Sequence, residues 1–158
     1  MATQTKKPAA RHKRSTRTAA QVDAYLALIT TAERFEREVV ELLKGAGLSP
    51  SQYNILRILR GAGDAGLACG QVGGRLVRHD PDVTRLMDRL EKRGLIARAR
   101  EQQDRRVVRT RITGAGLELL ESLDAPVDDL HDRQLGHLNE RRLGELTALL
   151  VEAGARGA

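Results

Sequence analysis

Polar and basic side chains at helical spacing offer the clearest chemistry in this sequence. Residues 80–92, DPDVTRLMDRLEK, place apolar side chains along one helix face: Val83, Leu86, Met87 and Leu90. The remaining surface of that helix presents Thr84, Arg85, Asp88, Arg89 and Lys92. Arginine neutralises phosphate and can donate two hydrogen bonds to one guanine edge, so a helix of this kind suits the major groove of a DNA duplex.

The boundaries of this helix can be predicted from its end residues. Asp80 is expected to be the N-cap, with Pro81 at the first helical position, where a missing N–H group costs nothing. Gly94 is expected to end the helix in a left-handed backbone conformation.

Two short segments that follow alternate with a period of two, as strands do. They run from Leu95 to Arg100 and from Val107 to Ile112, and the polar QQDRR between them fits a hairpin tip. The alternation predicts that one side of both strands presents Arg98, Arg100, Arg109 and Arg111. A thin β-ribbon can reach a minor groove beside the helix, which is the layout of a winged helix-turn-helix.

An exposed hairpin and a solvated helix are also compatible with arginine serving only solubility. Surfaces of that kind usually intersperse both signs of charge, whereas the predicted strands present arginine. We therefore favour nucleic-acid binding. Phosphate-binding candidates are Arg75, Arg78, Lys92, Arg98 and Arg100.

The charge of the chain is unevenly distributed along its 158 residues. Residues 1–22 hold six Lys or Arg and no acid, and residues 49–113 hold fourteen basic and seven acidic side chains. The remaining segments are acidic, so the net charge of +6 conceals a basic part between acidic helices. This asymmetry is expected when only one face approaches phosphate.

Apolar stripes on both sides of this part predict further helices. Residues 22–44 carry a stripe from Tyr25 to Leu42 at alternating spacings of three and four, and residues 114–138 form a second helix that Pro126 interrupts. Asn139 is expected to cap a last helix that ends at Gly154. These stripes fit an ordinary core or a subunit interface equally well.

Two helices are predicted ahead of residue 80. Ser49-Pro50-Ser51-Gln52 has the sequence of a capping box, so a helix should start there. The segment LACGQVGGRLVRH should be the next helix, with Leu67, Val72 and Leu76 inward. Its interior glycines each cost about 1 kcal/mol relative to alanine, so it should be short or mobile.

The segments VTRLMDRLEKRGLIAR and DRRVVRTRIT, followed by a glycine-led helix, resemble the multiple-antibiotic-resistance regulator (MarR) family. The resemblance is close from Leu48 to Gly116 and covers the flanking helices in pattern only. It implies a mainly α fold with a small β-hairpin wing, in which N- and C-terminal dimerisation helices, residues 22–44 and 114–154, flank a winged helix-turn-helix core, residues 48–113.

The resemblance also implies a function. Members of the family are dimeric transcription factors, most often repressors, that bind palindromic double-stranded DNA and respond to a small aromatic or phenolic effector. By analogy Arg106 would enter the minor groove, oriented through an ion pair with Asp104, and Arg105 would lie beside it. The alternatives are a winged-helix adaptor that binds protein without reading DNA, and a small hydrolase of unfamiliar sequence.

The first twenty residues contain almost no bulky apolar side chains and are expected to be a disordered basic tail, ahead of a single domain in residues 21–158. A non-specific DNA arm is favoured weakly over an inert tail, and a transit peptide is disfavoured. No membrane span or secretory signal is visible, so a cytoplasmic location is expected.

Enzymatic and metal-dependent functions find little support. No phosphate-cradling glycine motif follows a predicted strand, and neither HExxH nor CxxC occurs in the sequence. No cofactor or metal is expected. Cys69 fits a small buried side chain better than a redox sensor. Asp128, His131 and Asp132 have ligand-like spacing, but a solvated acidic helix face is the favoured interpretation.

Overall fold

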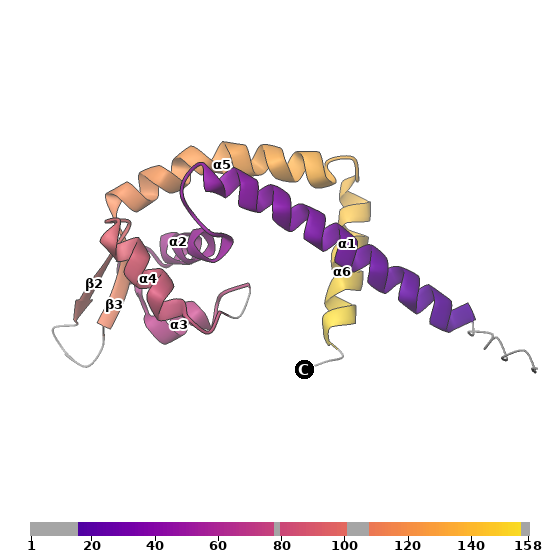
Figure 1. The fold of residues 1–158 in the computed structure, drawn as a ribbon, viewed down its shortest axis with the longest axis horizontal. Coiled ribbons are helices and arrows are strands. Elements are labelled where there is room, and N and C mark those ends of the chain that lie inside the picture. The colour runs from indigo at the N-terminus through magenta and orange to yellow at the C-terminus, as the bar shows by residue number, and fades with distance from the viewer. Residues whose placement is uncertain (1–15, 78–79, 101–107, 156–158) are drawn as a thin grey trace, which may run out of the picture. The chain divides into compact units, whose positions relative to one another are not determined.

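The computed structural model describes residues 16–77, 80–100 and 108–155 (Figure 1). In chain order they form α1 (Thr16–Lys44), α2 (Pro50–Ala62), the 3-10 helix η1 (Gly63–Ala65), β1 (Leu67–Ala68), α3 (Cys69–Gly73), α4 (Val83–Lys92), β2 (Ile96–Arg100), β3 (Val108–Ile112), α5 (Gly114–Leu135) and α6 (Glu140–Ala155). The chain divides into two compact units, residues 1–36 and residues 37–158. The mainly helical fold class with a small sheet is confirmed.

A core in the second unit holds the winged helix together. Leu43, Leu56, Leu59, Met87, Leu90 and Leu120 are fully buried there and come from α1, α2, α4 and α5. Burial of an aliphatic side chain of this size contributes about 1.5–3 kcal/mol relative to its exposure, so these contacts fix α4 against the rest of the unit.

The start of α2 confirms the predicted capping box. Ser49 is the N-cap, and its Oγ accepts a hydrogen bond of 3.2 Å from the backbone N–H of Gln52. The Gln52 side chain accepts one of 3.0 Å from the backbone N–H of Ser49 in return. Leu48 and Tyr53, on either side of the cap, are buried.

Three helix starts differ from the sequence prediction. α1 begins at Thr16 rather than residue 22, so residues 16–20 of the predicted tail are helical. Residues 1–15 of that tail lie outside the described part. α4 begins at Val83 rather than Pro81, because Asp82, at φ −117° and ψ 35°, is not helical. The Asp80 carboxylate instead accepts a hydrogen bond of 2.9 Å from Asp82 N–H in a turn before the helix.

The third difference concerns Leu67 and Ala68, which the sequence pattern predicts to be the start of a helix. In the structure they form the strand β1. Leu67 and Ala68 pair with Thr110 and Arg109 of β3, and α3 begins only at Cys69. The predicted inward positions of Leu67, Val72 and Leu76 hold, since the first two are buried and the third packs against the core. With five residues α3 is short, as its glycines predicted.

The register of the hairpin contradicts one prediction. Arg98 lies opposite Thr110 and Arg100 opposite Val108, whereas Arg109 lies opposite Ala99. Directly paired residues share a face of the sheet, so Arg98 and Arg100 occupy one face and Arg109 and Arg111 the other. The prediction that all four share one side was wrong, because period-two alternation fixes each strand but not the register between strands.

The C-terminal helices lie close to their predicted positions, but α5 is one helix that runs through Pro126 and is not interrupted there. α5 buries Leu120, Leu123, Val127 and Leu130, the predicted stripe, and ends at Leu135 rather than residue 138. Asn139 caps α6 through a hydrogen bond of 3.0 Å from Arg142 N–H to Asn139 Oδ1. All residues of α6 are described and none is buried. Apart from Leu143, which is half-buried, its apolar side chains are exposed in the single chain.

Candidate nucleic-acid interface

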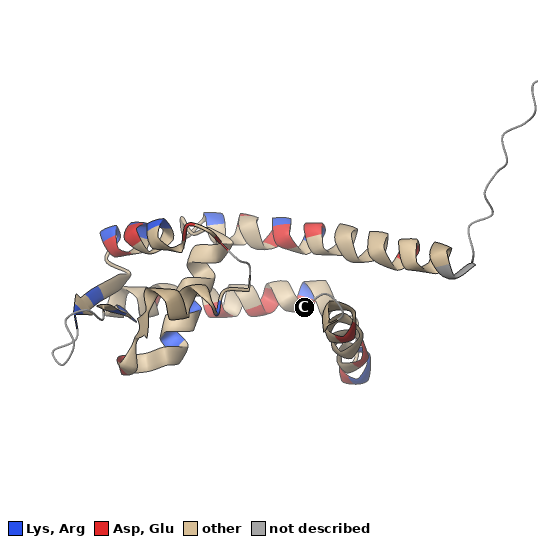
Figure 2. Cartoon of the chain, turned by 90° about the horizontal axis from the view of Figure 1, so that it is seen from below, with Lys and Arg blue, Asp and Glu red and all other residues tan. Residues whose placement is uncertain are grey.

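α4 presents a polar surface on a rigid support. Its inner side chains Met87 and Leu90 are fully buried, while Val83 and Leu86 pack against the same core. Its outer side chains are those predicted from the sequence, and Thr84, Arg85, Arg89 and Lys92 are all exposed. Figure 2 shows basic and acidic residues interspersed along this helix.

Arg85 and Arg89 are the best-placed side chains for reading bases. They are four residues apart and therefore neighbours on one helix face. Arg85 is 77% exposed, and its Nε lies 3.4 Å from Asp82 Oδ2, an exposed ion pair that can be exchanged at small cost. Thr84 lies beside α3, with its Oγ1 3.8 Å from Cys69 Sγ.

Arg98 and Asp88, both predicted to touch DNA, contact one another in this structure. Arg98 Nη2 donates a hydrogen bond of 2.5 Å to Asp88 Oδ1, and Arg98 Nε lies 3.4 Å from Glu91 Oε2. Its backbone N–H also donates to Glu91 Oε1 at 3.2 Å. The side chain of Arg98 is only 23% exposed, so it joins the hairpin to α4.

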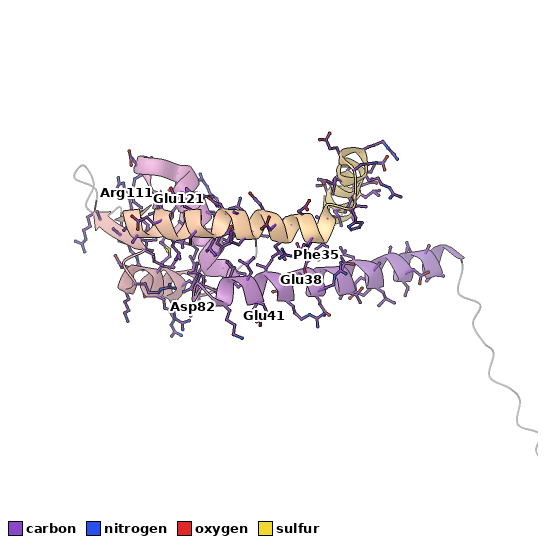
Figure 3. All side chains as sticks on the ribbon, turned by 90° about the horizontal axis from the view of Figure 1, so that it is seen from above. Phe35, Glu38, Glu41, Asp82, Arg111 and Glu121 are labelled. Atoms are coloured by element: carbon purple, nitrogen blue, oxygen red, sulfur yellow. The ribbon has the colours of Figure 1, made fainter. Side chains whose placement is uncertain are left out.

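The arginines of β3 brace the backbone on the other face of the sheet. Arg111, which is labelled in Figure 3, donates a hydrogen bond of 2.5 Å from its Nε to the carbonyl of Asp64. Arg109 Nη1 donates one of 3.4 Å to the carbonyl of Gly66. These contacts connect β3 with η1 and the residue before β1. Their guanidinium groups therefore support the hairpin from the side away from Arg98.

The remaining predicted residues fall into two groups. Arg75, which follows α3, and Arg100, at the end of β2, are exposed. Arg78, Asp104, Arg105 and Arg106 lie outside the described residues.

Two residues whose side chains bind backbone segments near α3 and α4 were missed in the sequence. Asn54 Oδ1 on α2 accepts a hydrogen bond of 3.1 Å from the backbone N–H of Val77, and so ties the segment after α3 to α2. Arg93, just after α4, donates to two backbone carbonyls between α1 and α2. Asn54 could have been found from the sequence, because it is a polar residue among the apolar positions of α2. Nothing in the local sequence indicates the contacts of Arg93.

An ion pair joins α2 to α5. Arg60 Nη1 donates to both carboxylate oxygens of Asp124, at 3.0 Å and 2.8 Å, and Nη2 donates a third hydrogen bond. This hydrogen bonding lowers the pKa of Asp124 below its ordinary value of 3.8. Nearby, burial raises the pKa of Tyr53, whose ring lies 5.8 Å from the Arg57 guanidinium.

The lowered pKa of Asp124 predicts a pH-dependent contribution to stability. A carboxyl group whose pKa is lower in the folded protein stabilises it above the unfolded pKa, and this stabilisation is lost as the pH falls through the folded pKa. Asp124→Asn should therefore lower the free energy of unfolding at pH 7, and this difference from wild type should shrink below about pH 4. Urea unfolding across that range is the measurement, with Asp129→Asn on the same helix as control. A difference that stays constant with pH would contradict this role.

Asp128, His131 and Asp132 on α5 do not form a metal site. Among the described residues, no three potential metal ligands lie close enough together to hold an ion. His131 Nδ1 instead lies 3.3 Å from Gln134 Oε1. Gln134 Nε2 donates a hydrogen bond of 2.9 Å to Oε2 of Glu38 on α1. Of the helices that the structure describes, none has the length and apolarity of a membrane span.

Comparison with known proteins places this architecture in a family. Residues 48–108 match the family model of the MarR family. The HTH-type transcriptional repressor MdtR of Bacillus subtilis is 29% identical over 134 residues, which cover 83% of this chain and 85% of MdtR.

Solved structures agree. A MarR transcription factor from Planctomyces limnophilus is 42% identical with a TM-score of 0.66, over 89% of this chain and 98% of that protein. The S. aureus MepR–DNA complex, 22% identical with a TM-score of 0.74 over 84% of this chain and 96% of MepR, has the same fold. The structure has a winged helix, the family model matches it, and one relative is 42% identical over 89% of this chain. The chain therefore belongs to the MarR family of transcriptional regulators.

Proposed function

We propose that this protein represses transcription by binding a palindromic operator as a homodimer. The observation that carries the proposal is that α4 has one face buried in the core and an opposite face that is exposed. The inner face is locked into the core by Met87 and Leu90, while the outer face leaves Arg85 and Arg89 exposed. A reading helix needs both, because bases are distinguished only when the side chains that reach them are held in register.

The proposed contacts follow from exposure and position. Arg85 and Arg89 read guanine edges, with Thr84 beside them, and Lys92, Arg75 and Arg100 contact phosphates. Arg78 is proposed as a further phosphate contact. At the hairpin tip Arg105 and Arg106 enter the minor groove, with Asp104 orienting Arg106.

The homodimer is supported by α6. Leu146, Leu149 and Leu150 are 37%, 65% and 44% exposed in the single chain and gather on one side of the helix. Contiguous apolar surface of this kind marks an interaction site in most proteins. A symmetric pair would place two α4 helices about 34 Å apart, which suits successive major grooves.

The proposal also covers the effector, the cellular location and the basic residues ahead of α1. A small aromatic or phenolic effector would bind between the dimerisation helices and the winged helix and change the spacing of the two α4 helices. The protein would act in the cytoplasm, and the basic residues ahead of α1 would add affinity without adding specificity.

A retardation assay with genomic fragments tests this function. Specific binding that weakens steeply with rising salt is expected, because phosphate contacts release counterions. No retardation of any fragment would contradict DNA binding and favour the adaptor alternative.

The proposed minor-groove contact gives a separate prediction. Arg106→Ala should weaken operator binding by about 1–3 kcal/mol, since the narrow groove favours an inserted guanidinium. Thermal unfolding should be unchanged, because the substitution removes no side chain of the described core. Titration of a labelled operator at fixed salt is the measurement, with Gln103→Ala as the control. Unchanged affinity would remove Arg106 from the interface.

A further inference from the structure

Arg93 connects two helix ends that lie far apart in the sequence. Its Nη1 donates a hydrogen bond of 2.7 Å to the carbonyl of Gly47, and its Nη2 donates one of 3.0 Å to the carbonyl of Ala46. Two donors of one planar guanidinium thus meet two successive carbonyls, a geometry that lysine cannot reproduce. We call this pair of contacts the Arg93 fork.

The carbonyl side of the fork is part of a rigid end of α1. Gly47 has φ 63° and donates its N–H to the carbonyl of Lys44 at 3.0 Å, and Leu48 N–H donates to the carbonyl of Leu43 at 3.1 Å. This is the hydrogen-bond pattern of a Schellman motif. Leu43 and Leu48 are buried, so the turn is attached to the core and moves with the end of α1.

The guanidinium side of the fork is part of an equivalent end of α4. Gly94 has φ 71° and donates its N–H to the carbonyl of Glu91 at 2.8 Å, and Leu95 N–H donates to the carbonyl of Leu90 at 3.0 Å. Leu90 and Leu95 are also buried. Arg93 therefore extends from a fixed point at the end of the proposed reading helix.

We propose that Arg93 is a positioning residue that couples the C-terminal end of α1 to the orientation of α4. The proposal rests on the proposed function, in which α4 reads DNA, and on the expectation that residues 22–44 of α1 are a dimerisation helix. A displacement of the end of α1 shifts the carbonyls of Ala46 and Gly47, and the fork passes that shift to α4. The alternative is that Arg93 contacts phosphate directly, and the two roles respond differently to salt and to a conservative substitution.

The test compares Arg93→Met and Arg93→Lys with wild type on one duplex that the wild type retards, over a series of salt concentrations. Both variants should bind about tenfold more weakly, because neither can form the fork. The slope of log affinity against log salt should stay at the wild-type value. Lys92→Met, at the adjacent proposed phosphate-binding position, should reduce the magnitude of that slope by about 0.9, since one phosphate fewer is neutralised.

Wild-type affinity in Arg93→Met would overturn the proposal. So would restored affinity in Arg93→Lys together with a shallower salt slope in Arg93→Met, since charge alone would then be sufficient.

Amide hydrogen exchange without DNA tests the coupling independently of the proposed function. Removal of the fork in Arg93→Met should accelerate exchange at Gly47 and Leu48, which lie at the end of α1 and far from the substitution in sequence. Unchanged exchange there would overturn the coupling. If wild type binds no duplex, the proposed function fails, and the exchange result still decides whether Arg93 couples the two helix ends.

Discussion

Leu146→Asp is expected to dissociate the protein into monomers. The substitution places an unpaired carboxylate in the proposed interface, where such a charge costs about 3–5 kcal/mol. Stability and operator affinity should fall with dimerisation, because a single winged helix binds a half-site weakly. Sedimentation at micromolar concentration measures the dissociation, and titration of the operator measures the affinity.

Ala148→Asp is the matched control for that experiment. It introduces the same charge two positions along α6, close to the opposite side of the helix. It should leave the dimer intact. A wild-type protein that sediments as a folded monomer yet binds its operator with undiminished affinity would contradict the dimer.

The second large effect is expected at Arg98. Arg98→Met leaves the carboxylates of Asp88 and Glu91 without their guanidinium partner on α4, the proposed reading helix. Breaking this ion pair should lower the free energy of unfolding by about 1–3 kcal/mol, and the freed carboxylates should repel phosphate. Operator affinity should therefore fall by about 1–2 kcal/mol.

A double-mutant cycle with Asp88→Asn separates this role from a phosphate contact. If Arg98 acts by holding the hairpin to α4, its substitution should matter less in the Asp88→Asn background, with a coupling above about 0.5 kcal/mol. Arg100→Met, on the same face of β2 but exposed, should show no coupling. Additive losses for Arg98 and Asp88 would show that the two residues act independently.

The parts of the fold that depend on local sequence were predictable. The capping box of Ser49 and Gln52 and the left-handed Gly94 follow from residues within one helical turn. The apolar stripe of α4 likewise identified its buried and exposed faces, including Arg85 and Arg89. Each of these features requires only short-range geometry.

Features that depend on long-range pairing were not predictable. A slip of one residue in the register of β2 and β3 moves Arg109 to the opposite face, and no local pattern decides it. The two residues of β1 are too few to show alternation, so pairing with Thr110 and Arg109 in β3 assigns them to the sheet. The Arg93 fork joins residues that are separated by 46 positions (Gly47 to Arg93) and by 47 positions (Ala46 to Arg93). No helical or strand periodicity extends over such a distance in the sequence.

These differences change which residues we propose as DNA contacts. The arginines of the hairpin look equivalent in the sequence, whereas the structure divides them by partner. Arg98 holds carboxylates of α4, and Arg111 holds a backbone carbonyl, while Arg100 is exposed. Arginine type and spacing predict a basic surface, but only the pairing shows which guanidinium groups are available to phosphate.

Selection of binding sites from a pool of random duplexes by the full-length protein tests the central claim most directly. We expect enrichment of an inverted repeat with guanine in each half-site and with half-site centres about 10 base pairs apart. Arg85→Ala and Arg89→Ala should each relax the preference at one position of the repeat. Recovery of a pool with no common sequence, or of a single site without two-fold symmetry, would contradict sequence-specific binding by a symmetric dimer.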